Sequence, residues 1–267
     1  MTLRRKNNNK NSVDIFGDYA DYYDIIYQDK DYVAESLFVS ELIKKNCRKE
    51  SRIRVLDLAC GTGLHAIELA TMGYEVDASD MSAKMINAAR ENARLKKLKI
   101  GFHQEAFQTA DRIRKKFDVV ISMFSAINYL ISYKDLLRSL KNIHGLLDHG
   151  GILVFDFWNG NAVIEDFAPV RVKRMNKGTK SVLRYSENTI DRLKQIIHVK
   201  FNFMLFDKDR LAKEFMENHI IRYYFLVEME NFLEMSSFKV INRCPFMSPG
   251  RAISYKDWNV TFVAKRI

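Results

Sequence analysis

The sequence reads RVLDLACGTG at residues 54–63, an apolar run that passes directly into a glycine-rich turn. The run is short, continuous and rich in branched side chains, which is typical of a strand covered on both faces of a parallel sheet. Two similar runs follow, FDVVISMF at 117–124 and GILVFDF at 151–157. Helical patterns lie between the runs, so strand and helix alternate from about residue 53 to 157. This alternation predicts an α/β fold with a doubly wound, mostly parallel sheet, whose βαβ core spans residues 52–157.

Serine and threonine residues mark the expected starts of the helices in this core. Thr62 is expected to cap the helix after the glycine turn, and Ser82 the helix after the next strand. Ser132 and Asp135 form a capping-box pattern before a third helix.

The segment before the core is predicted to be helical. Residues 13–48 are expected to form an N-terminal helical cover of two helices. The second helix is expected to turn Val33, Leu37, Phe38 and Leu42 inward, because they recur at helical spacing.

The segment after the core changes character. Residues 160–226 contain four strand-like stretches joined by polar turns, which predict an antiparallel sheet inserted into the parallel fold as a lid or a dimer surface. Residues 227–267 predict a closing helix and two closing strands. No repeat or linker divides the chain, so a single domain is expected over residues 1–267.

The composition limits the function classes. The chain has 267 residues, 47% hydrophobic and 28% charged, which is the profile of a folded globular domain without a membrane span. Its three cysteines are far apart, so neither a disulfide framework nor a metal site is expected, and the reducing cytoplasm is the expected location. A net charge of +10 attracts anions, either nucleic acid or an anionic small substrate.

The glycine turn and an aspartate beyond it indicate a nucleoside site. Gly61 and Gly63 let a ligand approach the backbone, and Asp80, nineteen positions after Gly61, can accept hydrogen bonds from both ribose hydroxyls. The spacing Gly61-x-Gly63-x-x-Ala66 also fits a dinucleotide fingerprint. Asp57 distinguishes between a phosphate-free nucleoside and a dinucleotide as the ligand. A carboxylate there repels a pyrophosphate by on the order of a few kcal/mol and attracts an ammonium or sulfonium group. This favours S-adenosylmethionine over NAD.

Motifs along the chain then give a family resemblance. The stretch VLDLACGTGLHAIELA resembles motif I of class I S-adenosylmethionine-dependent methyltransferases, and VDASDMSAKMINAAR resembles the acidic motif of their second strand. FDVVISMFSAINYL and LLDHGGILVFDFW are similar to their fourth and fifth strands. YADYYDIIYQDKDYVAE and HIIRYYF resemble a subgroup of small-molecule and amino-sugar methyltransferases. The resemblance implies a Rossmann-like methyltransferase fold with a seven-stranded sheet, and an enzyme that uses S-adenosylmethionine.

The resemblance also implies a role for each matching position. Asp57 would orient the methionine ammonium, Asp80 would bind the ribose, and Met81 would lie against the adenine. Ala59 departs from the family, since many members carry glycine there. The implied cofactor set is Tyr23, Tyr32, Asp57, Ala59, Gly61, Gly63, Asp80, Met81, Glu105, Ala106 and Met123.

Residues after the later strands are candidates for the acceptor side of the site. Carboxyl ends of parallel strands border the crevice in open α/β sheets. A histidine can act as a general base, and an arginine can hold an anionic substrate. The catalytic candidates are His219 and Tyr129, and the substrate-binding candidates are Asn128, Asp156, Trp158 and Arg222.

The expected reaction is an in-line N- or O-methyl transfer to a small molecule, such as a sugar or an anionic nucleotide-sugar. Base methylation is disfavoured, because residues 122–125 read SMFS where methyltransferases acting on DNA amino groups resemble Asp/Asn-Pro-Pro-Tyr/Phe. The basic clusters keep an RNA or tRNA methyltransferase as an alternative, and a non-enzymatic S-adenosylmethionine-binding module is another. A homodimer through the inserted strands also stays open.

Overall fold

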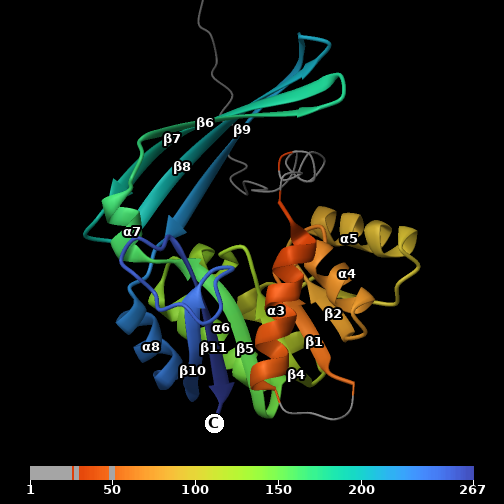
Figure 1. Ribbon diagram of the computed structural model, residues 1–267, viewed down its shortest axis with the longest axis vertical. Coiled ribbons are helices and arrows are strands. Elements are labelled where there is room, and N and C mark those ends of the chain that lie inside the picture. Colours follow the sequence, from red (N-terminus) through yellow and green to blue (C-terminus); the bar gives the residue numbers. More distant parts are fainter. Residues whose placement is uncertain (1–25, 27–29, 48–51) are drawn as a thin grey trace, which may run out of the picture.

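The computed structural model describes residues 26, 30–47 and 52–267 and shows two β-sheets, the larger one flanked by helices (Figure 1). The strands of the larger sheet are β1 (Arg54–Leu58), β2 (Glu75–Ser79), β3 (Gly101–His103), β4 (Phe117–Ser122), β5 (Leu147–Trp158), β10 (Phe238–Pro245) and β11 (Asn259–Arg266). They lie in the order β10-β11-β5-β4-β1-β2-β3. β11 runs antiparallel to both neighbours and the other pairs are parallel, which confirms the predicted fold class.

The topology leaves a crevice at the carboxyl ends of the middle strands. From β1 the chain proceeds to β2 and β3 on one side, whereas β4 and β5 lie on the other side. Loops after β1 and β4 therefore leave the sheet in opposite directions, and ligands of open α/β sheets bind at such a switch point. This crevice lies beyond Leu58 and Ser122, the last residues of the two strands.

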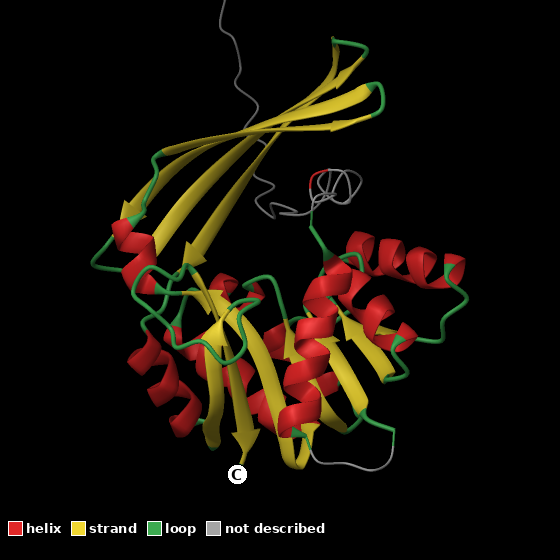
Figure 2. Cartoon of the chain, viewed as in Figure 1, coloured by secondary structure: helices red, strands yellow, loops and turns green. Residues whose placement is uncertain are grey.

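Helices cover both faces of the larger sheet (Figure 2). Val55 packs in a cluster with residues of α3 and α4, whereas the next residue, Leu56, packs in a cluster with residues of α6 and α8. Successive side chains of β1 are thus buried on opposite faces, which explains its continuous apolar run. The helices are α3 (Tyr32–Asn46), α4 (Leu64–Thr71), α5 (Ala83–Leu95), α6 (Tyr133–Leu146), α7 (Gly160–Glu165) and α8 (Leu226–Met235), with 3-10 turns η1 (Phe107–Arg112) and η2 (Ala126–Tyr129).

The predicted inward face of α3 is wrong at two positions. Phe38 and Leu42 are buried, but Val33 and Leu37 are 51% and 56% exposed. Polar contacts decide the rotation of this helix, because its buried Glu35 binds His65 of α4. A second such contact joins Ser40 Oγ to Tyr74 Oη at 2.8 Å. Apolar spacing alone does not predict these contacts.

The predicted helix caps are confirmed in two of three cases. Ser82 Oγ accepts from the Met85 amide at the start of α5, and Ser132 Oγ accepts from the Asp135 amide at the start of α6. Thr62 is not a cap, because α4 begins one position later than expected and its N-cap is Gly63 in the left-handed conformation. The glycine turn extends to the helix itself.

A four-stranded antiparallel sheet stands beyond the carboxyl ends of the larger sheet (Figure 1). It leaves and rejoins the core at one place, because Asn159 pairs with Tyr224 and the Gly160 amide donates to the Tyr224 carbonyl at 2.9 Å. Its strands are β6 (Val170–Lys177), β7 (Lys180–Asp191), β8 (Ile196–Asp207) and β9 (Arg210–Arg222). The predicted antiparallel insertion is therefore confirmed.

The two faces of this sheet differ in burial. Phe203 on β8 is buried and stacks on Phe215 of β9, on the face turned towards the core. On the other face, the cross-strand row through Tyr185 and Asn202 carries Val172 and Met216 at its ends, which are 66% and 57% exposed. The outer face is thus partly apolar and open.

Two further observations concern disulfide bonds and membrane-spanning helices. Cys47, Cys60 and Cys244 are all free thiols. In the part of the chain that the structure describes, no helix has both the length and the apolarity needed to cross a membrane.

Candidate functional site

The glycine turn after β1 is held against the end of β2 by backbone hydrogen bonds. The amides of Ala59 and Cys60 donate to the Ser79 carbonyl at 2.8 and 2.9 Å. Ala59, Gly61 and Gly63 all have positive φ angles, of 67°, 55° and 78°. Ala59 therefore adopts a conformation that favours glycine, consistent with the family residue at this position. The turn leaves backbone groups at the start of α4 facing the crevice.

Asp80 closes the turn from the other side. Its Oδ2 accepts from the Gly61 amide at 3.0 Å and its Oδ1 from the Ser82 amide at 2.9 Å. Burial raises the pKa of this carboxyl, while the two amides lower it. Each carboxylate oxygen has a second lone pair, so Asp80 can still accept hydrogen bonds from a diol.

Asp57, on β1, is buried beneath the turn. Its Oδ2 has no hydrogen-bond partner among the described residues. Burial, and to a smaller extent the charge of Asp80, raise the pKa of this carboxyl to about 7. A buried carboxylate oxygen without a donor is costly, and a cationic ligand relieves that cost. The site therefore fits a ligand that brings an ammonium group to Asp57.

The far wall of the crevice is formed by the loop after β4 and the end of β5. Asp156 is fully buried, and it accepts from the Ser125 amide and hydroxyl, both at 2.9 Å. Burial raises the pKa of the Asp156 carboxyl to about 6. Phe124 and Ser125 both have positive φ, a backbone conformation that costs energy for residues other than glycine. Asn128 lies behind them, and its Nδ2 is buried without a partner within the described ranges.

A chain of three polar side chains joins η2 to the four-stranded sheet. Tyr129 Oη lies 2.8 Å from His219 Nδ1. His219 Nε2 lies 3.2 Å from Glu217 Oε2, two residues earlier on the same face of β9. His219 and Glu217 are buried, whereas Tyr129 is 37% exposed. The two residues predicted as catalytic are thus in contact, and Tyr129 provides the open end of the chain.

Two predicted substrate residues are engaged within the protein. Arg222 donates to the Ile131 carbonyl at 2.8 Å and to Gln195 Oε1 at 2.7 Å. Trp158 packs edge-on against Trp258 with ring centroids 5.5 Å apart. Neither side chain joins the group formed by Asp57, Asp80 and Asp156.

The positions expected beside an adenine lie near Asp80 at the ends of β2 and β3. Met81 is 63% exposed, as expected of a residue that a flat ring would cover. Glu105 forms an ion pair with Arg112 at 3.7 Å. The Ala106 amide donates to Thr109 Oγ1 at 3.1 Å, so a ligand would compete for this donor.

Three cofactor candidates remain, of which two lie among the described residues. Met123 is buried directly after β4. Tyr32 begins α3, with its ring 5.1 Å from that of His65. Tyr23 lies outside the described residues.

Sequence reasoning missed a charged group at the start of α3. Lys30 Nζ lies 3.0 Å from Glu35 Oε2, and His65 Nε2 lies 2.8 Å from the same oxygen. Lys30 and Glu35 also line a cavity of about 210 Å³ together with Phe124, Asp156 and Lys173. Both residues stand within YQDKDYVAE, but their spacing gave no signal that their side chains lie largely out of solvent.

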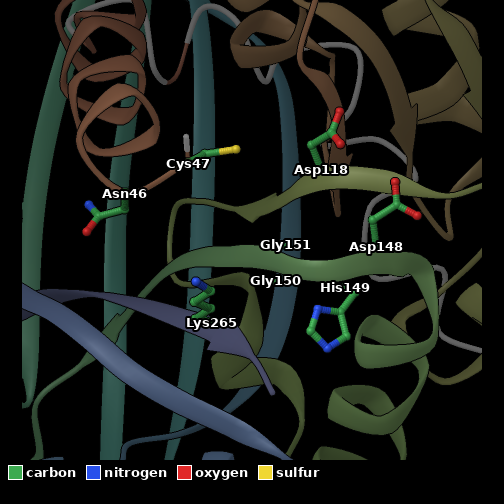
Figure 3. Close-up of a pocket in the computed structure, with 8 residues that line it drawn as sticks. All are labelled: Asn46, Cys47, Asp118, Asp148, His149, Gly150, Gly151 and Lys265. Carbon is green, nitrogen blue, oxygen red and sulfur yellow. The ribbon is translucent and has the colours of Figure 1, made fainter. Parts of the chain in front are cut away.

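A larger cavity of about 490 Å³ lies at the opposite end of the sheet (Figure 3). Its lining includes Asp118 near the start of β4, Asp148 and Gly151 early in β5, and Lys265 late in the antiparallel β11. Asp118 and Asp148 both pair with Arg54. This cavity is therefore separate from the switch-point crevice. No cluster of metal-ligating side chains occurs among residues 26, 30–47 and 52–267.

The chain is similar to a known protein family over its core and to curated proteins over a longer part of its length. A family described as a methyltransferase domain matches residues 55–151. A dTDP-3-amino-3,4,6-trideoxy-alpha-D-glucopyranose N,N-dimethyltransferase of Streptomyces venezuelae is 26% identical over 216 residues, which are 80% of this chain and 86% of that protein. A glycine/sarcosine N-methyltransferase of Aphanothece halophytica is 32% identical over 134 residues, about half of each chain.

Solved structures share the architecture over nearly the whole length. An S-adenosylmethionine-dependent methyltransferase from Clostridium acetobutylicum superimposes with a TM-score of 0.80 at 23% identity, covering 93% of this chain and 97% of that one. An amino pentose methyltransferase from Micromonospora echinaspora with S-adenosylmethionine bound has a TM-score of 0.74 at 20% identity, covering 94% and 98%. Both sheets described above thus belong to a fold that these proteins share.

Proposed function

Because the chain is a class I S-adenosylmethionine-dependent methyltransferase, we propose that its acceptor is the amine of a small sugar, free or linked to a nucleotide. The relative that matches 80% of this chain acts on such an amino sugar, as does a second relative from Streptomyces fradiae that is 26% identical over 78% of the chain. The glycine/sarcosine enzymes match only about half of the chain. The single observation that carries the proposal is the Tyr129–His219–Glu217 chain, which can take a proton from an amine.

The cofactor part of the proposal assigns roles to the residues around the glycine turn. S-adenosylmethionine supplies an electrophilic methyl group on a sulfonium when bound. Asp57 accepts from its ammonium and Asp80 from its ribose hydroxyls, while Gly61 and Gly63 allow close approach of the ligand to the backbone. Because the buried Asp57 oxygen has no partner among the described side chains, a cation is the group that this position lacks.

The acceptor part requires a base, because an amine is largely protonated near neutral pH and only its free lone pair attacks. Tyr129 takes the amine proton and passes its own phenolic proton to His219 Nδ1. Glu217 lies at the other nitrogen, where its charge stabilises the imidazolium that forms. The nitrogen–methyl bond forms as the sulfur–methyl bond breaks, and the proton leaves through this chain.

The four-stranded sheet provides the opposite wall of the acceptor site in this proposal. Lys173 on β6 lines the smaller cavity together with residues of the core, which places a positive charge there for an anionic substrate. We also propose that the apolar outer face, with Val172 and Met216, is where a homodimer would form, because exposed apolar area on a sheet is costly in water.

Turnover of labelled S-adenosylmethionine tests the substrate class. The panel contains amino sugars, their nucleoside-diphosphate derivatives, the matching hydroxyl sugars, glycine and tRNA. We expect methylation of the amino sugars and none of the hydroxyl sugars. Methylation of tRNA alone, or of hydroxyl sugars alone, would contradict the proposal.

Variants of the Tyr129–His219–Glu217 chain test the mechanism. Tyr129→Phe and His219→Gln should lower kcat by about 10²–10⁴-fold, the usual contribution of a general base, and leave the Kd of S-adenosylhomocysteine unchanged. Glu217→Gln should lower kcat less, since it acts through His219. Tyr255→Phe, at an exposed tyrosine, is the matched control. Wild-type kcat in Tyr129→Phe would remove the proton-transfer role.

A further inference from the structure

The chain at the end of β9 holds the segment between η2 and α6 by its backbone. The Tyr224 hydroxyl donates to the Leu130 carbonyl at 2.5 Å, and the Arg222 guanidinium donates to the Ile131 carbonyl at 2.8 Å. Leu130 and Ile131 are the two residues that follow Tyr129. These contacts therefore fix the course of the chain on which Tyr129 stands.

The Arg222 guanidinium connects this segment to the four-stranded sheet. Arg222 is 8% exposed, and its guanidinium carbon lies 3.9 Å from the centroid of the Tyr133 ring. One terminal nitrogen donates to the Ile131 carbonyl, and the other donates to Gln195 Oε1 at 2.7 Å, on the turn between β7 and β8. A guanidinium is a planar fork with fixed donor directions, so it holds two acceptors in one geometry, which a lysine ammonium does not.

Glu228, in the first turn of α8, holds both neighbours of the guanidinium. Its Oε2 accepts from Gln195 Nε2 at 3.1 Å, and its Oε1 accepts from the Tyr133 hydroxyl at 2.7 Å. The Gln195 amide thus stands between a buried cation, from which it accepts, and a carboxylate, to which it donates. Hydrogen bonds to charged groups are stronger than neutral ones, so both charges favour this orientation of the amide.

This cluster lies directly beside the proton-transfer chain of the proposed function. Proton transfer requires the Tyr129 hydroxyl to stay within hydrogen-bond distance of His219, where it now lies at 2.8 Å. We propose that Arg222 is a positioning residue for methyl transfer, which holds the Ile131 carbonyl so that the Tyr129 hydroxyl meets His219 Nδ1. The inference deepens the acceptor part of the proposed function and rests on it. This role replaces the substrate contact that the sequence predicted for Arg222.

A double-mutant cycle tests the proposal with the amino sugar that gives the highest turnover. Arg222→Lys keeps the charge and loses the fork, and we expect it to lower kcat about 10- to 100-fold, as a displacement of a catalytic group by about 1 Å does. The Kd of S-adenosylhomocysteine should not change. In the Tyr129→Phe background the same substitution should lower kcat by less than about twofold, because the chain is already interrupted. Arg192→Lys, at an exposed arginine of the turn that carries Gln195, is the matched control.

Fluorine NMR gives a second readout that needs no substrate. Fluorotyrosine replaces tyrosine throughout the protein, and the Tyr129 signal is assigned by its loss in Tyr129→Phe. We expect Arg222→Lys to move this signal towards that of free fluorotyrosine, and Arg192→Lys to leave it in place. Failure to methylate any amino sugar would contradict the proposed function, and the NMR comparison would still decide whether Arg222 positions Tyr129.

Three outcomes overturn the inference. An equal fall of kcat in both backgrounds would mean that Arg222 acts apart from Tyr129. A wild-type kcat in Arg222→Lys, or a Tyr129 signal that does not move, would mean that Tyr129 is placed without it. If Arg222→Lys does not fold, Gln195→Asn gives the same decision, because asparagine accepts the left-handed backbone at Gln195, with φ of 57°, and its shorter side chain loses the contact with Arg222.

Discussion

The glycine turn and the four-stranded sheet contribute to the crevice in different ways. Asp57, Gly61 and Asp80 lie within 23 positions of one another, and backbone amides of the same short segment fix their geometry. Tyr129 and His219 are 90 positions apart, and their contact exists only because β9 returns to η2. The cofactor side is thus a local structure, whereas the acceptor side depends on how two sheets are placed.

This difference explains why the two sides tolerate change differently. A local turn with positive φ angles is sensitive to single side chains, because the backbone has few alternatives there. The acceptor side changes when the strands of the smaller sheet shift in register or direction, because different side chains then reach the crevice. The same cofactor chemistry can then act on another substrate. We therefore expect the cofactor side to behave as the more strained of the two.

Asp57→Asn should have the largest effect on that side. The folded-state pKa of about 7 exceeds the ordinary pKa of 3.8, so between these pH values the folded protein holds a proton that the unfolded chain has released. Asp57 therefore lowers the free energy of unfolding as pH rises from about 4 to 7. Removing the titration should reduce the part of this fall between pH 5 and pH 8 by about 1–3 kcal/mol, at 1.36 kcal/mol per pKa unit. Denaturant unfolding without ligand at pH 5 and pH 8 measures it.

Asp57→Asn should also bind S-adenosylhomocysteine more weakly, because the proposed partner of the ligand's ammonium loses its charge. Asp156, whose pKa is also raised by burial, leaves part of the slope in place. Glu75→Gln, at the exposed start of β2, should leave both the slope and the Kd as in wild type. An unchanged pH slope in Asp57→Asn would show that the cofactor side carries no such electrostatic strain.

The fold could be predicted largely because each element has a local signature. The strands at RVLDL, FDVVIS and GILVFDF are buried on both faces, which makes their apolar runs continuous. The caps at Ser82 and Ser132 use side chains within three positions. The inward face of α3 and the start of α4 were wrong, because the former depends on Glu35 contacting His65 and the latter on a left-handed Gly63.

The site residues likewise divide into those with a local sequence signature and those whose role depends on tertiary contacts. Asp80 was found because it follows Gly61 at a fixed spacing, and the structure places it on the Gly61 amide. Lys30 and Glu217 were missed, because a charged residue in sequence normally indicates a solvated surface. Only the tertiary structure shows that Lys30 is buried against Phe124 and that Glu217 faces His219.

Asp80→Ala should weaken cofactor binding while leaving the acceptor side intact. In the proposed site the variant would lose charge-assisted hydrogen bonds to the ribose, so binding of S-adenosylhomocysteine should weaken by about 1–3 kcal/mol, which raises its Kd roughly 5- to 150-fold. Asp77→Ala is the matched control, because Asp77 lies on β2, three residues before Asp80, but pairs with His103 and Lys115. It should lower thermal stability without changing the Kd. Equal Kd values for Asp80→Ala and wild type would place the ribose elsewhere.

Two glycines with positive φ give the finest test of strain at the turn. At Gly63, with φ of 78°, an added Cβ would lie 2.8 Å from the Ala89 Cβ on α5. At Gly73, with φ of 97°, an added Cβ meets nothing within 4 Å. Both alanine variants incur the backbone cost of about 1–2 kcal/mol, but only Gly63→Ala also pushes on α5. Gly63→Ala should therefore be less stable than Gly73→Ala by about 1–2 kcal/mol in denaturant unfolding.

Ligand binding by the same two glycine variants shows whether the close packing at Gly63 matters for the site. If α5 must stay close to keep Ser82 on Asp80, then Gly63→Ala should also weaken S-adenosylhomocysteine binding, and Gly73→Ala should not. Equal stability of the two variants would mean that α5 shifts freely, and the glycine turn would then be no more constrained than an ordinary surface turn. The difference between the variants thus separates the backbone cost, which both share, from the packing that only the cofactor side requires.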